Sequence, residues 1–349
     1  MKDDTLTTEA SKNKKLKKLI LVLFFVIFPI SIFLISFMIG KYPISPSEFF
    51  KVIASRLIDI PATWEKPVET VLFKVRLPRV IAAMVVGAAL SVAGVSYQGM
   101  FKNPLVSPDI LGASAGAGFG ASLGIMLSLS MGQIQLSAFI FSIIAVTLVY
   151  SISNIMRNNQ VLGLVLAGML IGNLFQAFTS FLKFMADPND KLPSITFWLM
   201  GGLSSVDFHD LKSIMIPIAI GIIPLFLLRW KINLLTFGDE EARSMGINTK
   251  LLRFIVIICS TLITAASVSI SGMIGWVGLI VPHLSRMMVG PNYKILLPTT
   301  IVMGASYLLL VDNFARMLSS VEIPLGILTS LVGAPFFLFL ILHRRKERQ

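Results

Sequence analysis

The sequence has little charge, little histidine and almost no cysteine. Of its 349 residues, 14% are charged, 3 are His and 1 is Cys, whereas 55% are hydrophobic. Soluble domains carry about 25% charged residues, so this composition predicts an integral membrane protein. The lone Cys259 excludes a disulfide framework, and the histidines lie too far apart to suggest ligands of one metal ion. We therefore expect no metal site.

Motifs of nucleotide chemistry and covalent catalysis are also missing. The chain contains no Walker A motif and no glycine–serine nucleophile elbow. The net charge of +12 could indicate nucleic acid, but most basic residues lie between or beyond apolar runs, as membrane-topology signals do. We expect a chain that is not an enzyme, binds no cofactor itself and has no nucleic-acid partner.

Ten apolar segments follow one another along the chain. A helix needs about 20 apolar residues to cross a bilayer, and the candidate spans are residues 19–39, 80–98, 110–129, 134–155, 162–181, 211–228, 251–268, 276–288, 295–311 and 325–342. The eighth is short and carries Pro282, which predicts a broken or re-entrant helix. The fold class is an all-α, ten-helix polytopic bundle. A single transmembrane domain, 19–342, lies between basic tails at 1–18 and 343–349.

The basic residues predict the orientation. The lysine-rich tail precedes an apolar run too long for a secretory signal, and no cleavage site follows it, so we expect a retained span with its tail in the cytoplasm. With that orientation, most lysines and arginines fall on the inner side. Ten spans then put both termini, and the polar island 233–248, in the cytoplasm. We expect a lipid bilayer to surround these spans.

The polar island is patterned rather than merely hydrophilic. Apolar residues such as Leu234, Phe237 and Met245 flank a cluster of charges, and Gly238 and Gly246 predict two short helices or turns joined at glycine bends. The spans themselves hold almost no ionisable groups near mid-membrane, where ion-coupled carriers need them. The chain therefore suggests a passive pathway driven by a separate motor.

Several blocks of the sequence are similar to one family. Residues 75–124 (VRLPRVIAAMVVGAALSVAGVSYQGMFKNPLVSPDILGASAGAGFGASLG), 197–208 (FWLMGGLSSVDF), 234–247 (LLTFGDEEARSMGI) and 272–290 (GMIGWVGLIVPHLSRMMVG) resemble the FecCD-type permeases in order. Residues 296–318 and 322–342 continue the match. These permeases are the membrane subunits of type II ABC importers for iron-siderophores, haem and vitamin B12. The resemblance implies a second permease subunit, identical or paralogous, two ATPase subunits that hold ATP and Mg, and an extracytoplasmic binding protein.

The resemblance also implies roles for particular residues. Residues 234–247 match the coupling helices that enter a groove of the ATPase, and their central residues are Asp239, Glu240, Glu241, Ala242, Arg243, Ser244, Met245 and Gly246. Arg76, Arg79 and Arg316 match arginines that dock the binding protein; an arginine fork suits a carboxylate partner. Interfacial snorkelling is the alternative for these arginines.

Two further sets of residues carry open alternatives. Asn103 matches a position at the cytoplasmic gate, with Val161 and Leu162 aligned to the partner gate loop; an ordinary helix start is the other interpretation. Glycines recur every four residues in the third span, which predicts close helix packing rather than a substrate-lining surface. They are Gly112, Gly116, Gly120 and Gly124.

The expected function is that of an ABC importer permease for an iron(III)-siderophore. Haem, vitamin B12 and molybdate share the scaffold, and the sequence carries no chemical signature of the cargo. An ion-coupled secondary transporter and a membrane anchor without transport are the alternatives from other classes.

Overall fold

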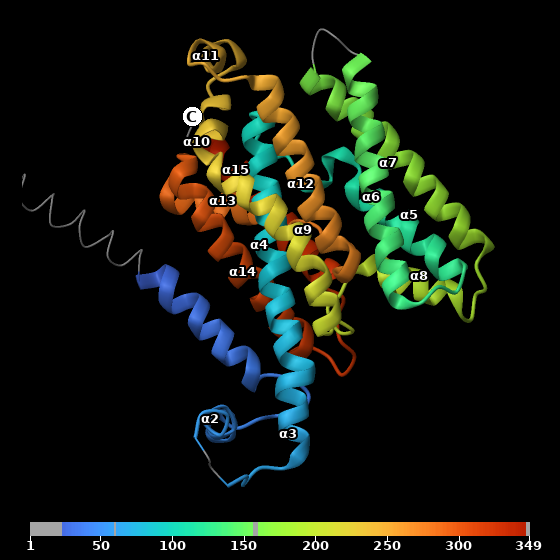
Figure 1. The fold of residues 1–349 in the computed structure, drawn as a ribbon, viewed down its shortest axis with the longest axis vertical. Helices are drawn as coiled ribbons and strands as arrows, with labels where there is room; N and C mark the ends of the chain where they lie inside the picture. Colours follow the sequence, from blue (N-terminus) through green and yellow to red (C-terminus); the bar gives the residue numbers. More distant parts are fainter. Residues whose placement is uncertain (1–22, 59–60, 156–159, 347–349) are drawn as a thin grey trace, which may run out of the picture.

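The computed structural model describes residues 23–58, 61–155 and 160–346, and within them the chain is helical with no strand (Figure 1). The all-α fold class is therefore confirmed. The predicted basic tail at residues 1–18 lies outside the described residues.

Each of the ten predicted spans corresponds to an apolar helix. Among the described residues, six helices are long and apolar enough to cross a membrane: Lys66–Phe101, α6 (Met131–Ile155), α7 (Gln160–Met185), α9 (Phe208–Leu227), α12 (Thr249–Ser271) and α14 (Tyr293–Met317). Four shorter apolar helices complete the set: Leu23–Met38, α5 (Ala113–Met126), α13 (Val277–Val289) and α15 (Leu325–Lys346). The chain is a multi-pass membrane protein.

The centre of the bundle is α4 (Leu77–Phe101), which continues α3 (Lys66–Thr70) and the π-helix η1 (Val71–Arg76) without a break. Its most apolar stretch is 83% buried, and α12, α13 and α14 pack around it. Glycines permit the closest crossings. A Cβ at Gly94 would lie 1.8 Å from the carbonyl oxygen of Gly278, and one at Gly87 would lie 2.2 Å from that of Gly304.

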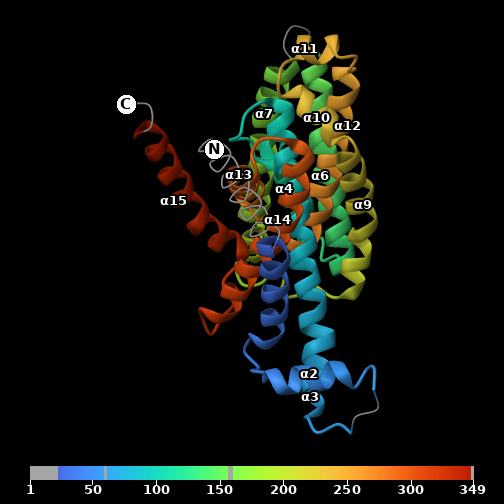
Figure 2. The same ribbon diagram turned by 90° about the vertical axis from the view of Figure 1, so that its left-hand side faces the viewer.

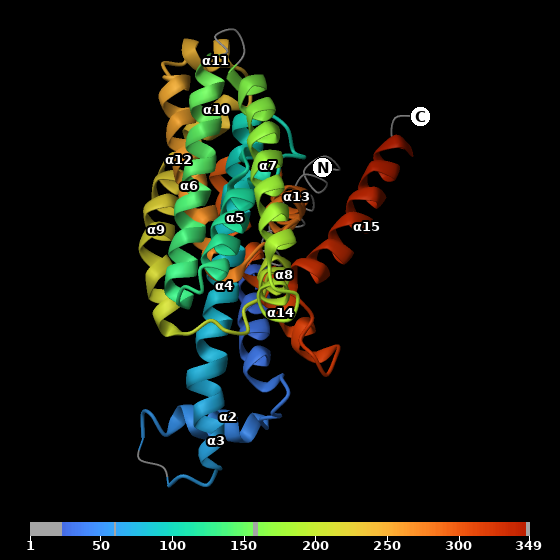
Figure 3. The same cartoon turned by 90° about the vertical axis from the view of Figure 1, so that its right-hand side faces the viewer.

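A second group of helices, α5, α6 and α7, packs together beside this core (Figures 1 and 3). The glycine ridge faces α6, since a Cβ at Gly116 or Gly120 would lie 2.4 or 2.5 Å from a backbone oxygen of that helix. Gly124 approaches Ile134 of α6 in the same way. Gly112 does not belong to the ridge; it is the turn before α5, with φ +75°, and lies beside Gly172 of α7.

Polar side chains start several helices where the sequence supplies them. Ser45 and Glu48 form a capping box for α2 (Pro46–Ala54), and Asp207 and Asp210 form one for α9. Asn248 accepts from the amide of Leu251 and so begins α12. These caps fix the lengths of helices whose apolar runs alone do not define an end.

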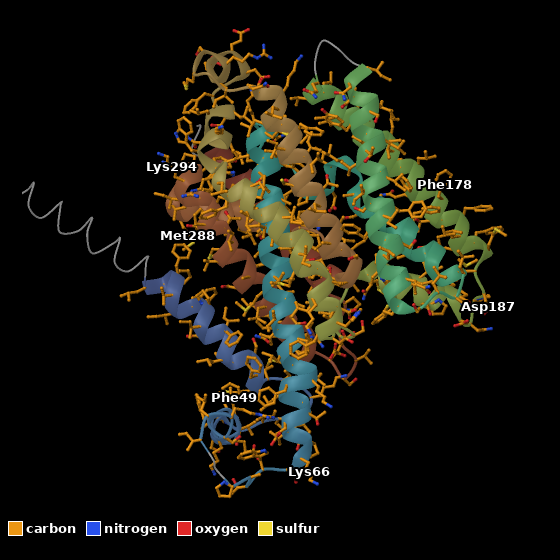
Figure 4. All side chains as sticks on the ribbon, in the orientation of Figure 1. Phe49, Lys66, Phe178, Asp187, Met288 and Lys294 are labelled. Atoms are coloured by element: carbon orange, nitrogen blue, oxygen red, sulfur yellow. The ribbon has the colours of Figure 1, made fainter. Side chains whose placement is uncertain are left out.

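The extramembrane helices mark the two ends of the bundle. Helices α2 and α3 lie at one end, called here the α2 end; α10 (Arg229–Leu235) and α11 (Asp239–Ser244) lie at the opposite, α11 end (Figure 1). Figure 4 places Phe49 and Lys66 at the α2 end, and Asp187, beyond α7, nearer to it than to α11. The sequence did not predict α2, α3 or α8 (Lys191–Met200).

The last helix leans away from the bundle. Figures 2 and 3 show α15 diverging from α13 and α14 along its length. It starts against α8, where a Cβ at Gly326 would meet the carbonyl oxygen of Met200 at 2.5 Å. The helix extends to Lys346, so it continues into the predicted basic tail at 343–349, because basic residues at a helix end are compatible with continued helix; the tail boundary stays a prediction.

Candidate functional site

The polar island contains the end of α10 and the whole of α11, at the α11 end, with bends at its two glycines. Gly238, with φ +143°, separates α10 from α11, and Gly246, with φ +80°, ends α11. Both values lie in the region that favours glycine. Phe237 and Met245 are 64% and 54% exposed, and Glu240, Glu241 and Ser244 are also exposed. The island therefore presents two apolar side chains among charged and polar groups.

The base of this surface is buried. Ala242 is fully covered, and Leu234, Leu235 and Ile247 are buried in the main hydrophobic core. The apolar residues of the island thus fall into two sets. Leu234, Leu235 and Ile247 anchor the island in the core, whereas Phe237 and Met245 remain on the surface. We call the exposed set, with Glu240, Glu241 and Ser244, the α11 knob.

Not every charge of the island is available for a partner. A carboxylate oxygen of Asp239 accepts from Nη2 of Arg253 at 2.5 Å and lies 3.9 Å from Nζ of Lys102. Arg243 donates from Nε to the hydroxyl of Thr249 at 3.3 Å. Asp239 therefore joins α11 to α12 and to the end of α4, and Arg243 joins it to the start of α12.

Polar side chains that sequence reasoning missed connect α10 to the core, and α4 to α13. Asn233 accepts from the backbone amide of Tyr293 at 3.2 Å, and the Tyr293 hydroxyl donates to the carbonyl of Val95 in α4 at 3.0 Å. Gln98 accepts from Arg286 of α13 at 2.9 Å. In the sequence, the only sign of these bonds is that polar residues occur near the ends of the apolar segments. The α11 knob is thereby tied to α4, α12 and α14, and α4 is tied to α13.

At the other end of α4, the arginines expected at an exposed mouth are buried. Arg79 lies 2.8 Å from Asp312 and 2.8 Å from Glu322, and its side chain is 7% exposed. Its Nε and Nη2 donate to Asp312, which is fully buried, and its Nη1 donates to both oxygens of Glu322, which is 28% exposed. We call these three residues the Arg79 cluster.

The other two arginines also have partners within the chain. Arg316 lies 3.2 Å from Asp312 and donates to the backbone carbonyls of Ser36 and Ile39. Arg76 donates to the carbonyls of Phe37 and Tyr42. Both side chains therefore hold the first apolar helix, Leu23–Met38, against α4 and α14. Docking by these arginines stays a prediction. In this structure an arginine would have to leave its carboxylate or carbonyl partners within the chain before it could bind a carboxylate of the binding protein.

The predicted gate residues lie on separate elements. Asn103 is exposed in the turn after α4, where its Oδ1 accepts from the amide of Leu105 at 2.9 Å. Val161 and Leu162 lie in the first turn of α7 and are half-buried and exposed. The gate role stays a prediction.

A cavity of about 540 Å³ lies between α5, α7, the end of α8 and the segment after Gly272. Most of its polar lining comes from α7: Asn173, Gln176, Thr179, Ser180 and Lys183. The 3-10 helix η2 (Pro108–Leu111) contributes Asp109, which accepts from the hydroxyls of Ser107 and Ser114. Burial raises the pKa of Asp109, an effect that the two hydroxyls partly oppose.

Within the part of the chain that the structure describes, one set of side chains lies close enough together to reach a single cation. Candidate ligand atoms of Asp207, His209 and Asp210 lie within 4.8 Å of one another. Asp207, however, caps α9, and Asp210 accepts from the amide of Gln135 at 2.9 Å. Both carboxylates thus have structural partners, and the set gives no reason to revise the expectation of no metal.

Comparisons with known proteins agree with this architecture. The family model described as the FecCD transport family matches residues 25–343. The chain is 42% identical over 304 residues to the molybdate import system permease protein MolB of Haemophilus influenzae, covering 87% of this chain and 89% of that protein. It is 42% identical over 275 residues to a probable iron chelatin transport system permease protein of Helicobacter pylori, covering 79% and 83%.

A solved structure is similar as well. It is described as an inward-facing conformation of a metal-chelate type ABC transporter, and the match has a TM-score of 0.83 with 40% identity, covering 92% of this chain and 99% of that one. Helix arrangement and sequence therefore lead to the same assignment. The chain belongs to the FecCD transport family and is an ABC importer permease.

Proposed function

We propose that this permease forms the translocation pathway for an iron(III)-siderophore, which an extracytoplasmic binding protein delivers and a separate ATPase drives. The α11 end faces the cytoplasm and the α2 end faces outward, with both termini in the cytoplasm of a bacterial cell. Two permease subunits, identical or paralogous, and two ATPase subunits make up the transporter. ATP and Mg belong to the ATPase.

The α11 knob is the observation that supports this function most directly. Phe237 and Met245 project from a base whose apolar residues are buried and whose Asp239 is bonded to Arg253. Burying an apolar side chain of this size in a partner's groove contributes about 1.5–3 kcal/mol. Because the base is anchored to α4, α12 and α14, a push on the knob moves the bundle as a body.

The cargo proposal draws on the relatives. A Helicobacter pylori relative is named for iron chelatin, and a Bacillus subtilis relative, 33% identical over 353 residues, is named as an Fe(3+)-citrate import system permease. Molybdate is the second candidate, because MolB matches at the same identity over a longer stretch. Haem and vitamin B12 import are further alternatives within the family, since relatives carry those names too.

An ion-coupled mechanism requires a carboxylate that can exchange a cation or proton within the membrane. The fully buried Asp312 does not suit that task, because Arg79 and Arg316 lie 2.8 and 3.2 Å from it and stabilise its charge. This arrangement favours an external energy source.

Vesicle uptake tests the proposal. The complete transporter, reconstituted in vesicles with its ATPase and loaded binding protein, should import a ferric siderophore only when ATP is present on the side of the membrane that carries the ATPase. Molybdate, offered in parallel, should accumulate far more slowly. Uptake driven by a proton gradient without ATP would refute the ABC mechanism, whereas ATP-driven uptake of molybdate alone would refute only the cargo.

A further inference from the structure

A smaller cavity lies where the two groups of helices meet. It has a volume of about 200 Å³ and lies between α6, from the second group, and α12, from the core around α4. In Figure 1, these two helices face each other across the boundary between the groups. We call this cavity the α6–α12 groove. Its walls are mainly apolar and include Ile143, Val146 and Tyr150 on α6 and Phe254, Ile257 and Ile258 on α12.

The threonine hydroxyls of the groove already have partners. The hydroxyl of Thr147 donates to a carbonyl oxygen of its own helix at 2.8 Å, and that of Thr261 lies 3.3 Å from the hydroxyl of Tyr97. The groove therefore offers hydrocarbon rather than free hydrogen-bonding groups. Both helices are membrane spans, and Phe254 and Ile258 are 39% and 48% exposed. The open side of the groove thus lies at the depth of the acyl chains.

Both walls of the groove lead to a polar residue at the α11 end. On α12, Lys250 precedes Phe254 by four positions, so the two side chains share one face of the helix. On α6, Asn154 follows Tyr150 by the same interval, and the rings of Tyr150 and Phe254 lie 5.5 Å apart across the seam. Lys250 is exposed and forms no ion pair within the described part of the chain. An apolar groove therefore ends beside an unpaired cation.

The length of the groove matches one leaflet of a bilayer. Eleven residues of helix separate Ile143, at its far end, from Asn154, and they extend about 16 Å. The hydrocarbon of one leaflet is about 15 Å thick, half of the bilayer core. A lipid with its headgroup beside Lys250 can therefore lay one acyl chain along the whole groove without crossing the midplane.

We propose that the α6–α12 groove binds one acyl chain of an anionic phospholipid, whose headgroup lies beside Lys250. The chain supplies contact atoms to a lining that otherwise lacks them. Any lipid tail can do this, so the headgroup provides the selectivity: one basic side chain near the membrane surface favours an anionic lipid about fivefold. The bound lipid bridges α6 and α12, and hence the two helix groups. With the proposed orientation, it comes from the inner leaflet.

Native mass spectrometry of the full-length permease tests the headgroup. Phosphatidylglycerol and phosphatidylcholine with identical acyl chains are titrated into the same micelles. The first phosphatidylglycerol should bind about fivefold more tightly than the first phosphatidylcholine, and Lys250→Gln should abolish this preference. Lys294→Gln is the matched control, since Lys294 is also exposed but begins α14, on the other side of α12 from α6 in Figure 4. It should keep the preference.

A second pair of variants tests the acyl chain. Thr147→Trp places an indole in the groove, and the first, tighter binding step should be lost for both lipids, because the ring occupies the space of the chain. Leu148→Trp places the same ring at the next position, which is 42% exposed and does not line the groove. This variant should bind both lipids as the unchanged permease does.

Three results would overturn the proposal. Equal affinity for the two headgroups, or a preference that survives Lys250→Gln, would exclude the anionic site. Equal lipid binding by Thr147→Trp and Leu148→Trp would place the chain outside the groove. A lipid-free dimer that Thr147→Trp disrupts would mean that a second copy covers the groove. The titrations involve neither cargo nor ATP, so each of these results leaves the proposed transport function intact.

Discussion

The Arg79 cluster allows one prediction to be worked out in detail. Asp312→Asn removes a carboxylate that is fully buried, 2.8 Å from Arg79 and 3.2 Å from Arg316. The side chains of Arg79 and Arg316 are 7% and 5% exposed, and after the substitution the partly exposed carboxylate of Glu322 is the one acidic group left beside them. Breaking a buried ion pair from one side costs about 3–5 kcal/mol, because the remaining charge stays desolvated.

Glu322→Gln provides the matched control, since it acts on the same arginine. Glu322 is 28% exposed, so after its charge is removed water can reach Nη1 of Arg79 and accept a hydrogen bond from it. Partly exposed pairs contribute about 0.2–1 kcal/mol. We therefore expect Asp312→Asn to lower the free energy of unfolding by at least about 2 kcal/mol more than Glu322→Gln.

The measurement is a denaturant titration of the purified permease in mixed micelles, followed by the loss of helical circular dichroism. Arg79→Gln and the double variant Arg79→Gln/Asp312→Asn complete a cycle. Because the two side chains share three hydrogen bonds, the double variant should cost less than the sum of the single ones by at least about 1 kcal/mol. Equal costs for the Asp312 and Glu322 variants, or strict additivity in the cycle, would refute the reasoning.

Three further predictions concern other parts of the molecule. Phe237→Ala with Met245→Ala should reduce ATPase-driven transport at least about tenfold without changing stability, because both side chains are exposed; unchanged coupling in vesicles would remove the α11 knob from the ATPase contact. Glu322→Gln should tighten binding-protein association about fivefold in a pull-down titration, since it frees one arm of the buried arginine; weaker association would count against docking at that site. Gly94→Ala should prevent recovery of folded permease, whereas Gly132→Ala, with open space around it, should be tolerated; equal yields would contradict the close helix crossing.

The positions of the spans follow from the sequence because apolar runs are a local property. Each of the ten runs coincides with an apolar helix, and the bends at Gly238 and Gly246 follow from residues that tolerate positive φ. The eighth run also illustrates this: α13 is short, contains Pro282 and follows a non-helical segment from Gly272.

The buried arginines could not be predicted in the same way. Arg79 and Asp312 are 233 positions apart in the sequence, and their meeting depends on how α4 and α14 are rotated against each other. Arg79 lies near the end of a span, and that position alone suggests an exposed side chain. Its burial comes from packing against residues that are distant in the sequence. Asp312 and Arg316, four positions apart in an apolar helix, were the one local sign of an internal ion pair.

The same limit applies to the polar residues of α7. Their spacing is visible in the sequence, yet equally spaced polar residues can face a neighbouring helix. Only the structure shows that Asn173, Gln176 and Thr179 line one cavity, and that the hydroxyl of Thr179 donates to its own backbone. It likewise separates the exposed Phe237 from the buried Leu234 and Leu235.

The unbroken helix from Lys66 to Phe101 joins the two ends of the molecule mechanically. Its 36 residues extend about 54 Å, well beyond the roughly 30 Å of a bilayer's hydrocarbon core. Arg76 and Arg79 lie toward one end, and Lys102, beside Asp239, directly follows the other. A tilt of about 5° about one end would displace the other by about 5 Å, close to one helical turn. A single rigid helix of this length can transmit a displacement from one side of the membrane to the other directly. Its π-helical segment, Val71–Arg76, is where we expect it to bend.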